Sequence, residues 1–268
     1  MNAPLPAAPR PRRFRSPGWW LLLLALASCA WAGWREYDHR AAVREAEAEF
    51  EWRAIEPIPL IRANWRAAFR KATWTETYRR LYVGGDRDLA RLRPLLLRLR
   101  PTWLSALACT DANLDALKGL SSLKSLNLDF CTAVQNVDGL KGLTGLEWLQ
   151  LTHSPALQNV DALKGLSGLQ RLEISDCPAL HNLDALKGLA GLQELSLSGS
   201  SSLQNVDALK GLIGLQKLDL SRCPALQNVD GIKGLSALQE LDLTSCPQLP
   251  AAAVAELRAA LPQTSIQN

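Results

Sequence analysis

The side chains best suited to chemistry in this chain are six cysteines and three histidines. Thiolates and imidazoles bind transition metals and act as nucleophiles or bases. A zinc site usually draws two of its cysteines from positions a few residues apart, and no two cysteines lie that close here. None of the histidines, His39, His153 and His181, has a second ligand at helical spacing. We therefore expect no metal site and no cofactor.

Catalytic motifs are also missing from the sequence. It contains no H-E-x-x-H, no G-x-S-x-G, no phosphate-binding P-loop and no glycine-rich dinucleotide motif after a strand. Carboxylates are plentiful, but they recur at fixed spacings where a structural role is sufficient. We expect no catalytic residues and no enzymatic activity.

The cysteines instead mark a repeat. Cysteine or serine fills one position every 23 residues: Cys131, Ser154, Cys177, Ser200, Cys223 and Cys246. Cys131 and Cys177 are two units apart, roughly 10 Å at about 4.8 Å per strand, which is too far for a disulfide. Cys223 and Cys246 occupy adjacent units and could approach that distance. Because serine replaces cysteine at the same position, buried thiols are the favoured interpretation.

Leucine follows the same period. Six units begin at Leu117, Leu140, Leu163, Leu186, Leu209 and Ile232. Each contains the spacing L-x-x-L-x-L-x-x-C/S, as in Leu123, Leu126, Leu128 and Cys131, with isoleucine once in place of leucine. This spacing predicts a short strand whose leucines face a core. Since apolar residues make up 47% of the chain and aromatic residues only 6%, leucine must fill that core.

Polar residues keep the same period. Each unit has an aspartate three residues before a lysine, and the aspartates are Asp115, Asp138, Asp161, Asp184, Asp207 and Asp230. We expect each aspartate to be the N-cap of a short helical turn. Asparagines such as Asn136 and Asn159 should bond loop backbone between units. The lysines form either a polyanion site or a solvated edge beside the aspartates, and the solvated edge is favoured.

The combined pattern resembles the leucine-rich repeat family, and most closely the short repeats of internalin-like bacterial proteins. Cysteine or serine replaces the more usual asparagine at the turn, as in the cysteine-containing subtype. The resemblance covers residues 101–268 and implies an α/β solenoid. About eight parallel strands should line its concave face, with short helical turns on the convex face. A single unit cannot bury enough apolar surface to fold alone, so the units must stack.

The ends of the predicted solenoid differ from its interior, as capping requires. Residues 103–109 read as a shortened first strand. Residues 251–261 predict a longer closing helix, and residues 264–266 a last edge strand.

The first hundred residues have a different character, with 19 basic and 10 acidic side chains. Residues 1–16 form a basic tail with four arginines and no acid, and residues 17–34 carry no charge. Eighteen helical residues span roughly 27 Å, close to the ~30 Å of a bilayer core. Tryptophans at both ends fit the membrane interfaces. We predict a single-pass anchor with a cytoplasmic N-terminus and the repeats on the periplasmic or extracellular side.

Two alternatives for this segment stay open. Leu26-Ala27-Ser28-Cys29 resembles the lipobox of bacterial lipoproteins, a resemblance that implies lipidation of Cys29 and removal of the preceding residues. Ordinary signal cleavage would give a secreted protein. All three interpretations place the repeats outside the cytoplasm.

Residues 35–100 predict a helical, basic stem that also caps the repeats. Helices are expected over 35–54, 61–82 and 86–99. Residues 62–100 hold 11 basic and 3 acidic side chains. This excess fits a solvated helix face, or contact with anionic lipid headgroups. Nucleic acid is not an expected partner, because the region is predicted to lie outside the cytoplasm.

The variable positions on the concave face are the candidate binding surface. Phe130, Trp148 and His153 come from adjacent units and form a candidate hot spot, because aromatic residues dominate binding energy at interfaces. The candidate partner-binding residues are Phe130, Trp148, His153, Arg171, Asp176 and Arg222. Trp148 could instead lie flat on neighbouring aliphatic stems or under the N-terminal stem. We predict a module that binds a protein or peptide; the alternative is a scaffold or spacer of the cell envelope without a dedicated ligand.

Overall fold

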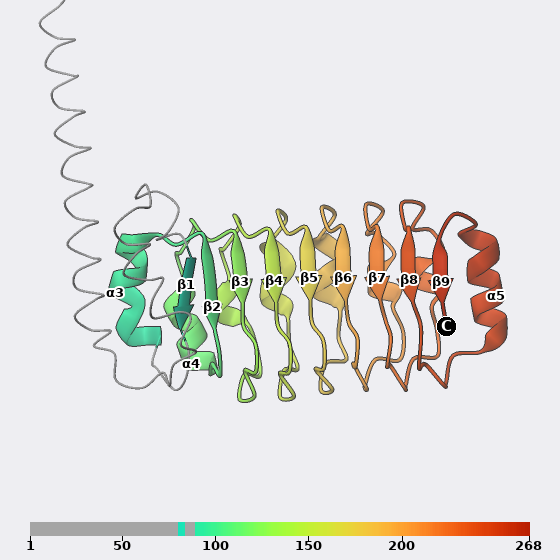
Figure 1. Cartoon of the computed structure of the whole chain (residues 1–268), viewed down its shortest axis with the longest axis horizontal. Coiled ribbons are helices and arrows are strands. Elements are labelled where there is room, and N and C mark those ends of the chain that lie inside the picture. Colours follow the sequence, from blue (N-terminus) through green and yellow to red (C-terminus); the bar gives the residue numbers. More distant parts are fainter. Residues whose placement is uncertain (1–79, 84–88) are drawn as a thin grey trace, which may run out of the picture. The chain divides into compact units, whose positions relative to one another are not determined.

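The computed structural model describes residues 80–83 and 89–268, which fall within one of the chain's two units, Trp52–Asn268. Nine strands form one sheet in chain order, and every neighbouring pair is parallel (Figure 1). The register advances by one repeat per strand, so Leu126 pairs with Leu149 and Leu149 with Leu172. The predicted leucine-rich repeat solenoid is confirmed.

Most of the strands are only three residues long. The strands are β1 (Arg80–Val83), β2 (Trp103–Ala106), β3 (Ser125–Asn127), β4 (Trp148–Gln150), β5 (Arg171–Glu173), β6 (Glu194–Ser196), β7 (Lys217–Asp219), β8 (Glu240–Asp242) and β9 (Ser265–Gln267). The eight strands expected from the sequence are β2 to β9. The predicted helix over 61–82 is wrong at its described end, because residues 80–82 belong to β1. This strand pairs with the edge of β2, whose backbone groups would otherwise lack a partner there.

Short 3₁₀ turns connect the strands on the other side of each unit. They are η2 (Asp115–Leu117), η3 (Asp138–Leu140), η4 (Asp161–Gly165), η5 (Asp184–Gly188), η6 (Asp207–Leu209) and η7 (Asp230–Ile232). Three α-helices complete the described chain: α3 (Leu89–Leu99), α4 (Asp111–Leu114) and α5 (Ala251–Ala260). Helices α3 and α5 lie at opposite ends of the sheet and cover the first and last repeats (Figure 1).

Stacked leucines make the core. In each unit the leucines of the L-x-x-L-x-L spacing are buried, and Leu126, Leu128, Leu149 and Leu151 have no exposed surface. Each buried leucine stabilises the fold by roughly 25 cal/mol for every Å² of apolar surface that it removes from water. Every interior unit contacts the same neighbours, and the same side chains therefore recur in each one. At the first end, helix α3 covers the core with Leu89 and other buried leucines.

The repeated aspartates have a different role from the one expected. Each begins its 3₁₀ turn as the first helical residue, and the N-cap position before it is held by another residue, such as Val137 or Val160, that makes no side-chain capping hydrogen bond. The asparagine two residues earlier provides that bond instead, since the Asp138 N–H donates to Asn136 Oδ1 over 3.0 Å. The Asn136 side chain thus bonds backbone within its own unit, and its amide also donates to Asp111 Oδ2 of the preceding unit over 3.1 Å. The aspartates pair with the lysines three residues later, as in Asp115–Lys118 at 2.7 Å, which fits the solvated-edge interpretation.

Among the helices of residues 80–83 and 89–268, none combines the length and apolar composition needed to cross a bilayer. The predicted anchor at 17–34, the possible lipidation of Cys29 and the stem up to residue 79 lie outside the described residues. These stay predictions.

Candidate functional site

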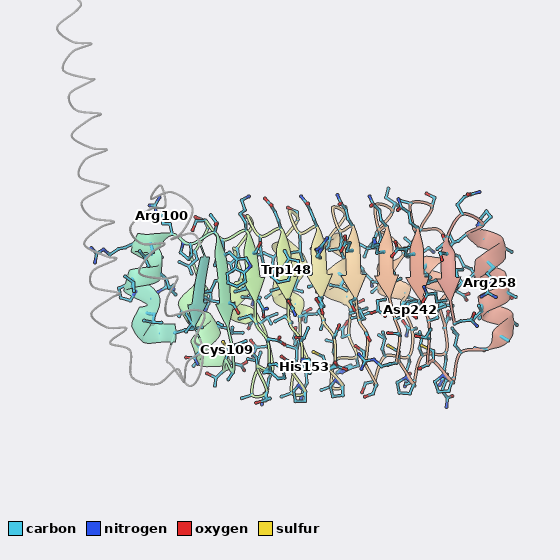
Figure 2. All side chains as sticks on the ribbon, in the orientation of Figure 1. Arg100, Cys109, Trp148, His153, Asp242 and Arg258 are labelled. Atoms are coloured by element: carbon cyan, nitrogen blue, oxygen red, sulfur yellow. The ribbon has the colours of Figure 1, made fainter. Side chains whose placement is uncertain are left out.

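The concave face of the sheet carries an open groove of about 730 Å³, which we call the strand groove. In β5 to β8 the middle leucine is buried, and the residues on either side of it line the groove. The polar and aromatic side chains that line it are Trp148, Arg171, Glu173, Glu194, Ser196, Lys217, Asp219, Glu240, Asp242, Ser265 and Gln267. Figure 2 shows Trp148 on β4 and Asp242 near the other end of the sheet. The groove therefore runs from β4 to β9.

Ion pairs between neighbouring strands order one row of this groove. Arg171 holds Glu194 with two contacts, Nε to Oε2 and Nη2 to Oε1, each 2.7 Å long. Lys217 Nζ lies 2.9 Å from Glu240 Oε1, and this contact raises the pKa of Lys217. Both pairs join residues in direct register on adjacent strands. Because the partners hold one another, their charged ends stay in fixed places on the groove surface.

A second row is acidic. Glu173, Asp219 and Asp242 end strands β5, β7 and β8, and Ser196 ends β6 between the first two. Partial burial, followed by repulsion from Asp129 and Asp219, raises the pKa of Glu173. The groove lining as a whole has five carboxylates and two cations. Its surface therefore favours hydrogen-bond donors and positive charge on a partner.

A separate row of side chains follows the ends of the strands. We call it the turn ladder, and it consists of Phe130, His153, Asp176, Gly199 and Arg222. All five residues adopt the left-handed backbone conformation, with φ between 51° and 72°. That conformation is uncommon for residues other than glycine, asparagine and aspartate, and for a bulky residue such as Phe130 it is an outlier. The turn imposes it, because the same backbone geometry recurs in every unit.

The first two members of the turn ladder stack on each other. The Phe130 and His153 rings lie 4.5 Å apart between centroids and 12° from parallel. His153 also lies between two carboxylates: Nδ1 is 3.3 Å from Asp129 Oδ1, and Nε2 is 3.5 Å from Asp176 Oδ2. Phe130 remains 52% exposed despite the stack. The pair is therefore an ordered aromatic surface open to solvent.

The ladder continues through Asp176 to Arg222. Arg222 Nη2 lies 3.5 Å from Asp176 Oδ1 and donates to Ser198 Oγ over 3.0 Å. The unit between them has Gly199, and a Cβ there would lie 2.3 Å from Asp176 Oδ1. The missing side chain of Gly199 leaves the space in which the carboxylate reaches toward Arg222. The polar contacts thus run without interruption from Asp129 to Arg222.

The structure places the six predicted partner-binding residues in two sets. Trp148 and Arg171 lie in the strand groove, whereas Phe130, His153, Asp176 and Arg222 belong to the turn ladder. His153 follows Trp148 by five residues along the chain, a span of at most about 16 Å. Figure 2 shows this separation, with Trp148 over the strands and His153 at the edge where the chain leaves them.

The concave face is narrower than expected from the sequence. The concave face was expected to include all the variable positions of each strand and turn, but four of them, Thr152, Ser175, Ser198 and Ser221, are buried. These hydroxyl groups bond across units, as between Ser198 Oγ and Ser221 Oγ at 2.9 Å. The groove residues Glu194, Lys217, Glu240 and Asp242 were not singled out from the sequence. The sequence did contain a signal for three of them, because Arg171 and Glu194, and likewise Lys217 and Glu240, carry opposite charges one repeat of 23 residues apart.

The cysteine position is part of the core. Cys131, Cys177 and Cys223 are buried, and all five cysteines from Cys109 onward are free thiols. Burial raises the pKa of Cys177 to about 11. Across residues 80–83 and 89–268, no three or more histidine, cysteine or acidic side chains are grouped so as to hold a metal ion.

Comparisons with solved structures identify the same fold in bacterial proteins. An internalin (inlF) from Listeria monocytogenes gives a TM-score of 0.55 at 18% identity, covering 70% of this chain and 54% of that one. The leucine-rich repeat domain of the type III effector XopL gives 0.54 at 19% identity, covering 88% of this chain and 93% of that domain. An internalin C2 from Listeria monocytogenes gives 0.50 at 25% identity, covering 65% and 72%.

The chain spans about half the length of the first of these internalins. No family model matches the sequence, and no curated protein matches it. The likeness shows a leucine-rich repeat fold of the kind found in bacterial internalins and effectors. Solenoids of this kind typically use their concave surface to bind other proteins.

Proposed function

We propose that the strand groove binds a protein or peptide partner, and that this is the function of the chain. The observation that carries the proposal is the groove itself: an open surface of about 730 Å³ with Trp148 half-buried at its β4 end. The core positions hardly change between units, whereas one row of the concave face changes from unit to unit, with glutamate the one residue type that occurs twice: Ser125, Trp148, Arg171, Glu194, Lys217 and Glu240. A scaffold needs only the constant positions.

The surface chemistry of the groove suits a partner that is not itself strongly acidic. Arg171 and Lys217 are already paired with carboxylates, so they offer little attraction to an anion. In the second row, Asp219 and Asp242 already accept hydrogen bonds from Ser196, Ser221 and Thr244, but their negative charges can still face a cation of the partner. Trp148 supplies the large amphipathic side chain that most often anchors interfaces. An extended segment lying across the strands would contact all three features.

The turn ladder forms an ordered rim beside this groove. Its polar groups are satisfied among themselves, through Asp129, Asp176 and Ser198. Phe130 is the exposed apolar element of the rim. We propose that contacts in the strand groove contribute most of the binding free energy. The turn ladder would contribute less, because contacts at the periphery of an interface are solvated and usually weaker.

We also propose that the partner is met outside the cytoplasm. The basic tail of residues 1–16 followed by the uncharged segment 17–34 supports this location. Either a retained anchor or a lipid on Cys29 would tether the repeats to a membrane. Reporter fusions at the C-terminus, one active only in the cytoplasm and one only outside it, test the location directly.

Site-specific photo-crosslinking tests the binding function. A photoreactive amino acid is placed at Ser196, inside the groove, or at Ile213, which is 66% exposed and outside the groove lining. Irradiation in the source cell should give a distinct adduct from position 196, and the Trp148→Ala change should remove it. An envelope scaffold without a dedicated ligand would give no adduct that depends on Trp148. That result would reject the groove as a binding site.

A further inference from the structure

Cys109 and Cys131 are neighbours in the solenoid. They occupy the same position in adjacent units, and the Cys109 backbone nitrogen donates to Cys131 Sγ over 3.3 Å. Both residues are buried in the core of the first two units. Adjacent strands are about 4.8 Å apart, which lies within the range of roughly 4.4–6.8 Å between the Cα atoms of a disulfide. The backbone therefore already holds these residues at disulfide spacing.

The first unit is one residue shorter than the others, which hides this relationship in the sequence. Leu104 pairs with Leu126 at an offset of 22 residues, and Cys109 precedes Cys131 by the same offset. The next cysteine along the core, Cys177, has serines at this position in both adjacent units. It has no thiol in a neighbouring unit with which to react.

Cys223 and Cys246 also occupy adjacent units, but their thiols are engaged elsewhere. Cys223 Sγ donates to the Leu197 carbonyl over 3.4 Å, and Cys246 Sγ donates to the Leu220 carbonyl over 3.1 Å. The corresponding distance from Cys131 Sγ to the carbonyl of the preceding unit is 4.0 Å. Cys131 Sγ accepts the backbone N–H of Cys109 and donates to the carbonyl of Asp129 over 3.7 Å, so its bond to the preceding unit is the longest of the three.

These contacts make the thiols of Cys109 and Cys131 differ in reactivity. Contact with the Cys109 side chain, followed by the bond from the Cys109 backbone N–H, lowers the pKa of Cys131, whereas contact with Cys131 and burial raise the pKa of Cys109. Burial raises the pKa of Cys223 to about 12. Since the thiolate is the attacking species in disulfide exchange, Cys131 is the sulfur that reacts first.

We propose that Cys109 and Cys131 form a disulfide when the chain meets a small-molecule disulfide oxidant such as glutathione disulfide. The Cys131 thiolate attacks one sulfur of the oxidant, forms a mixed disulfide and releases one glutathione thiolate. Cys109 loses its proton and attacks the Cys131 sulfur, which releases the second glutathione thiolate. Two electrons pass from the two cysteines to the oxidant, and the two protons go to the two glutathione molecules.

The bond would fasten the first two units of the solenoid together next to the turn ladder. Phe130 directly precedes Cys131 in the chain, so the cross-link would restrain the backbone that presents the exposed ring. Both sulfurs are buried, with exposures of 3% for Cys109 and 0% for Cys131. The oxidant therefore reaches them during folding or when the first units open, and the closed bond is then protected from reductants.

Refolding of the full chain tests the proposal. The protein is reduced and unfolded, refolded in a mixture of glutathione and glutathione disulfide, and its remaining thiols are blocked with N-ethylmaleimide. Trypsin separates the relevant cysteines, with Cys109 in residues 99–118 and Cys131 in residues 125–141. We expect these two peptides to be joined, with a mass lower than their sum by two hydrogen atoms. The number of free thiols should fall by two.

Two variants serve as controls. Cys131→Ser should abolish the joined peptide, and it should fold because serine occupies the same position at Ser154 and Ser200. Cys177→Ser should leave the joined peptide unchanged. The urea midpoint of the wild type should be higher when oxidised than when reduced, with no such difference in Cys131→Ser. Recovery of both peptides unjoined, with blocked thiols or glutathione adducts, or a bond between Cys223 and Cys246 instead, would overturn the proposal.

Discussion

The Asp176 carboxylate occupies the space in which Gly199, at the same position of the next unit, has no side chain. A Cβ on Gly199 would come within 2.3 Å of Asp176 Oδ1. Through that space Asp176 connects His153, in the unit before, to Arg222, two units after. A glycine in the turn ladder is therefore part of what aligns its charged side chains.

Substitution of Gly199 by alanine should destabilise the protein and disturb this network. The residue has φ of +72°, where a Cβ costs about 1–2 kcal/mol, and the Asp176 carboxylate must move as well. We expect urea denaturation to show a loss of at least about 1 kcal/mol. The matched control is Gly165→Ala, where a Cβ meets nothing within 4 Å and the change should be neutral. Equal effects of the two substitutions would contradict the assignment.

Gly139 should be intolerant of alanine, although four other units have alanine at its position. The equivalent residues are Ala116, Ala162, Ala185 and Ala208. At Gly139 a Cβ would lie 2.2 Å from the backbone carbon of Leu114, which cannot swing away as a side chain can. We expect Gly139→Ala to lower the free energy of unfolding by about 1–3 kcal/mol. The reverse change, Ala162→Gly, should lower it by only about 0.5–1 kcal/mol.

The stack of Phe130 on His153 should stabilise the turn ladder modestly. A double-mutant cycle with Phe130→Ala, His153→Ala and the combined variant isolates the interaction between the rings. We expect a coupling free energy of about 0.5–1.5 kcal/mol in thermal or urea unfolding. Strictly additive effects would show that the two rings do not interact in solution.

Glu173 should destabilise the folded protein when it is ionised. Its pKa is raised in the folded state above the ordinary 4.5, so the charged form is disfavoured relative to the unfolded chain. The loss of stability caused by ionised Glu173 is fully present at a pH above the folded-state pKa, and it vanishes at a pH below the pKa of Glu173 in the unfolded chain. Glu173→Gln should therefore be more stable than the wild type near neutral pH, by less than about 1 kcal/mol because water screens the site. The gain should disappear as the pH falls toward 4.5.

Glu194→Gln is the control for this pH dependence. Glu194 is held by Arg171, so removal of its charge should give no gain at neutral pH and a slight loss, within the ~1 kcal/mol typical of exposed ion pairs. Urea denaturation curves at several pH values measure both variants. A Glu173→Gln protein that is less stable than the wild type at neutral pH would show that the ionised Glu173 carboxylate does not destabilise the folded protein.

The sheet could be predicted from the sequence because its determinants repeat. Leu126, Leu149 and Leu172 recur at 23 residues and meet the same neighbours in each unit, so one register satisfies them all. Strand β1 could not be predicted this way. Residues 80–83 fall outside the repeat, and their conformation depends on pairing with the edge of β2.

The backbone conformation of the turn ladder could not be predicted from the sequence either. The residues at this position are Phe130, His153, Asp176, Gly199 and Arg222, and of these types only glycine and, more weakly, aspartate favour a left-handed conformation. Tertiary structure imposes that conformation on the others. It also separates Trp148 from Phe130 and His153, because the chain turns away from the sheet after three residues of strand. The direction of the side chains was predictable within the strands, where the leucines face the core, but not in the turns that follow them.

The affinity of the partner for Trp148→Ala is the measurement that tests the central claim most directly. The partner captured from Ser196 is purified, and its dissociation constant is measured for the wild type, Trp148→Ala and the exposed control Ile213→Ala. If the strand groove is the binding surface, Trp148→Ala should bind about tenfold more weakly or worse, while Ile213→Ala should bind like the wild type. Equal affinities for the wild type and Trp148→Ala would contradict the account.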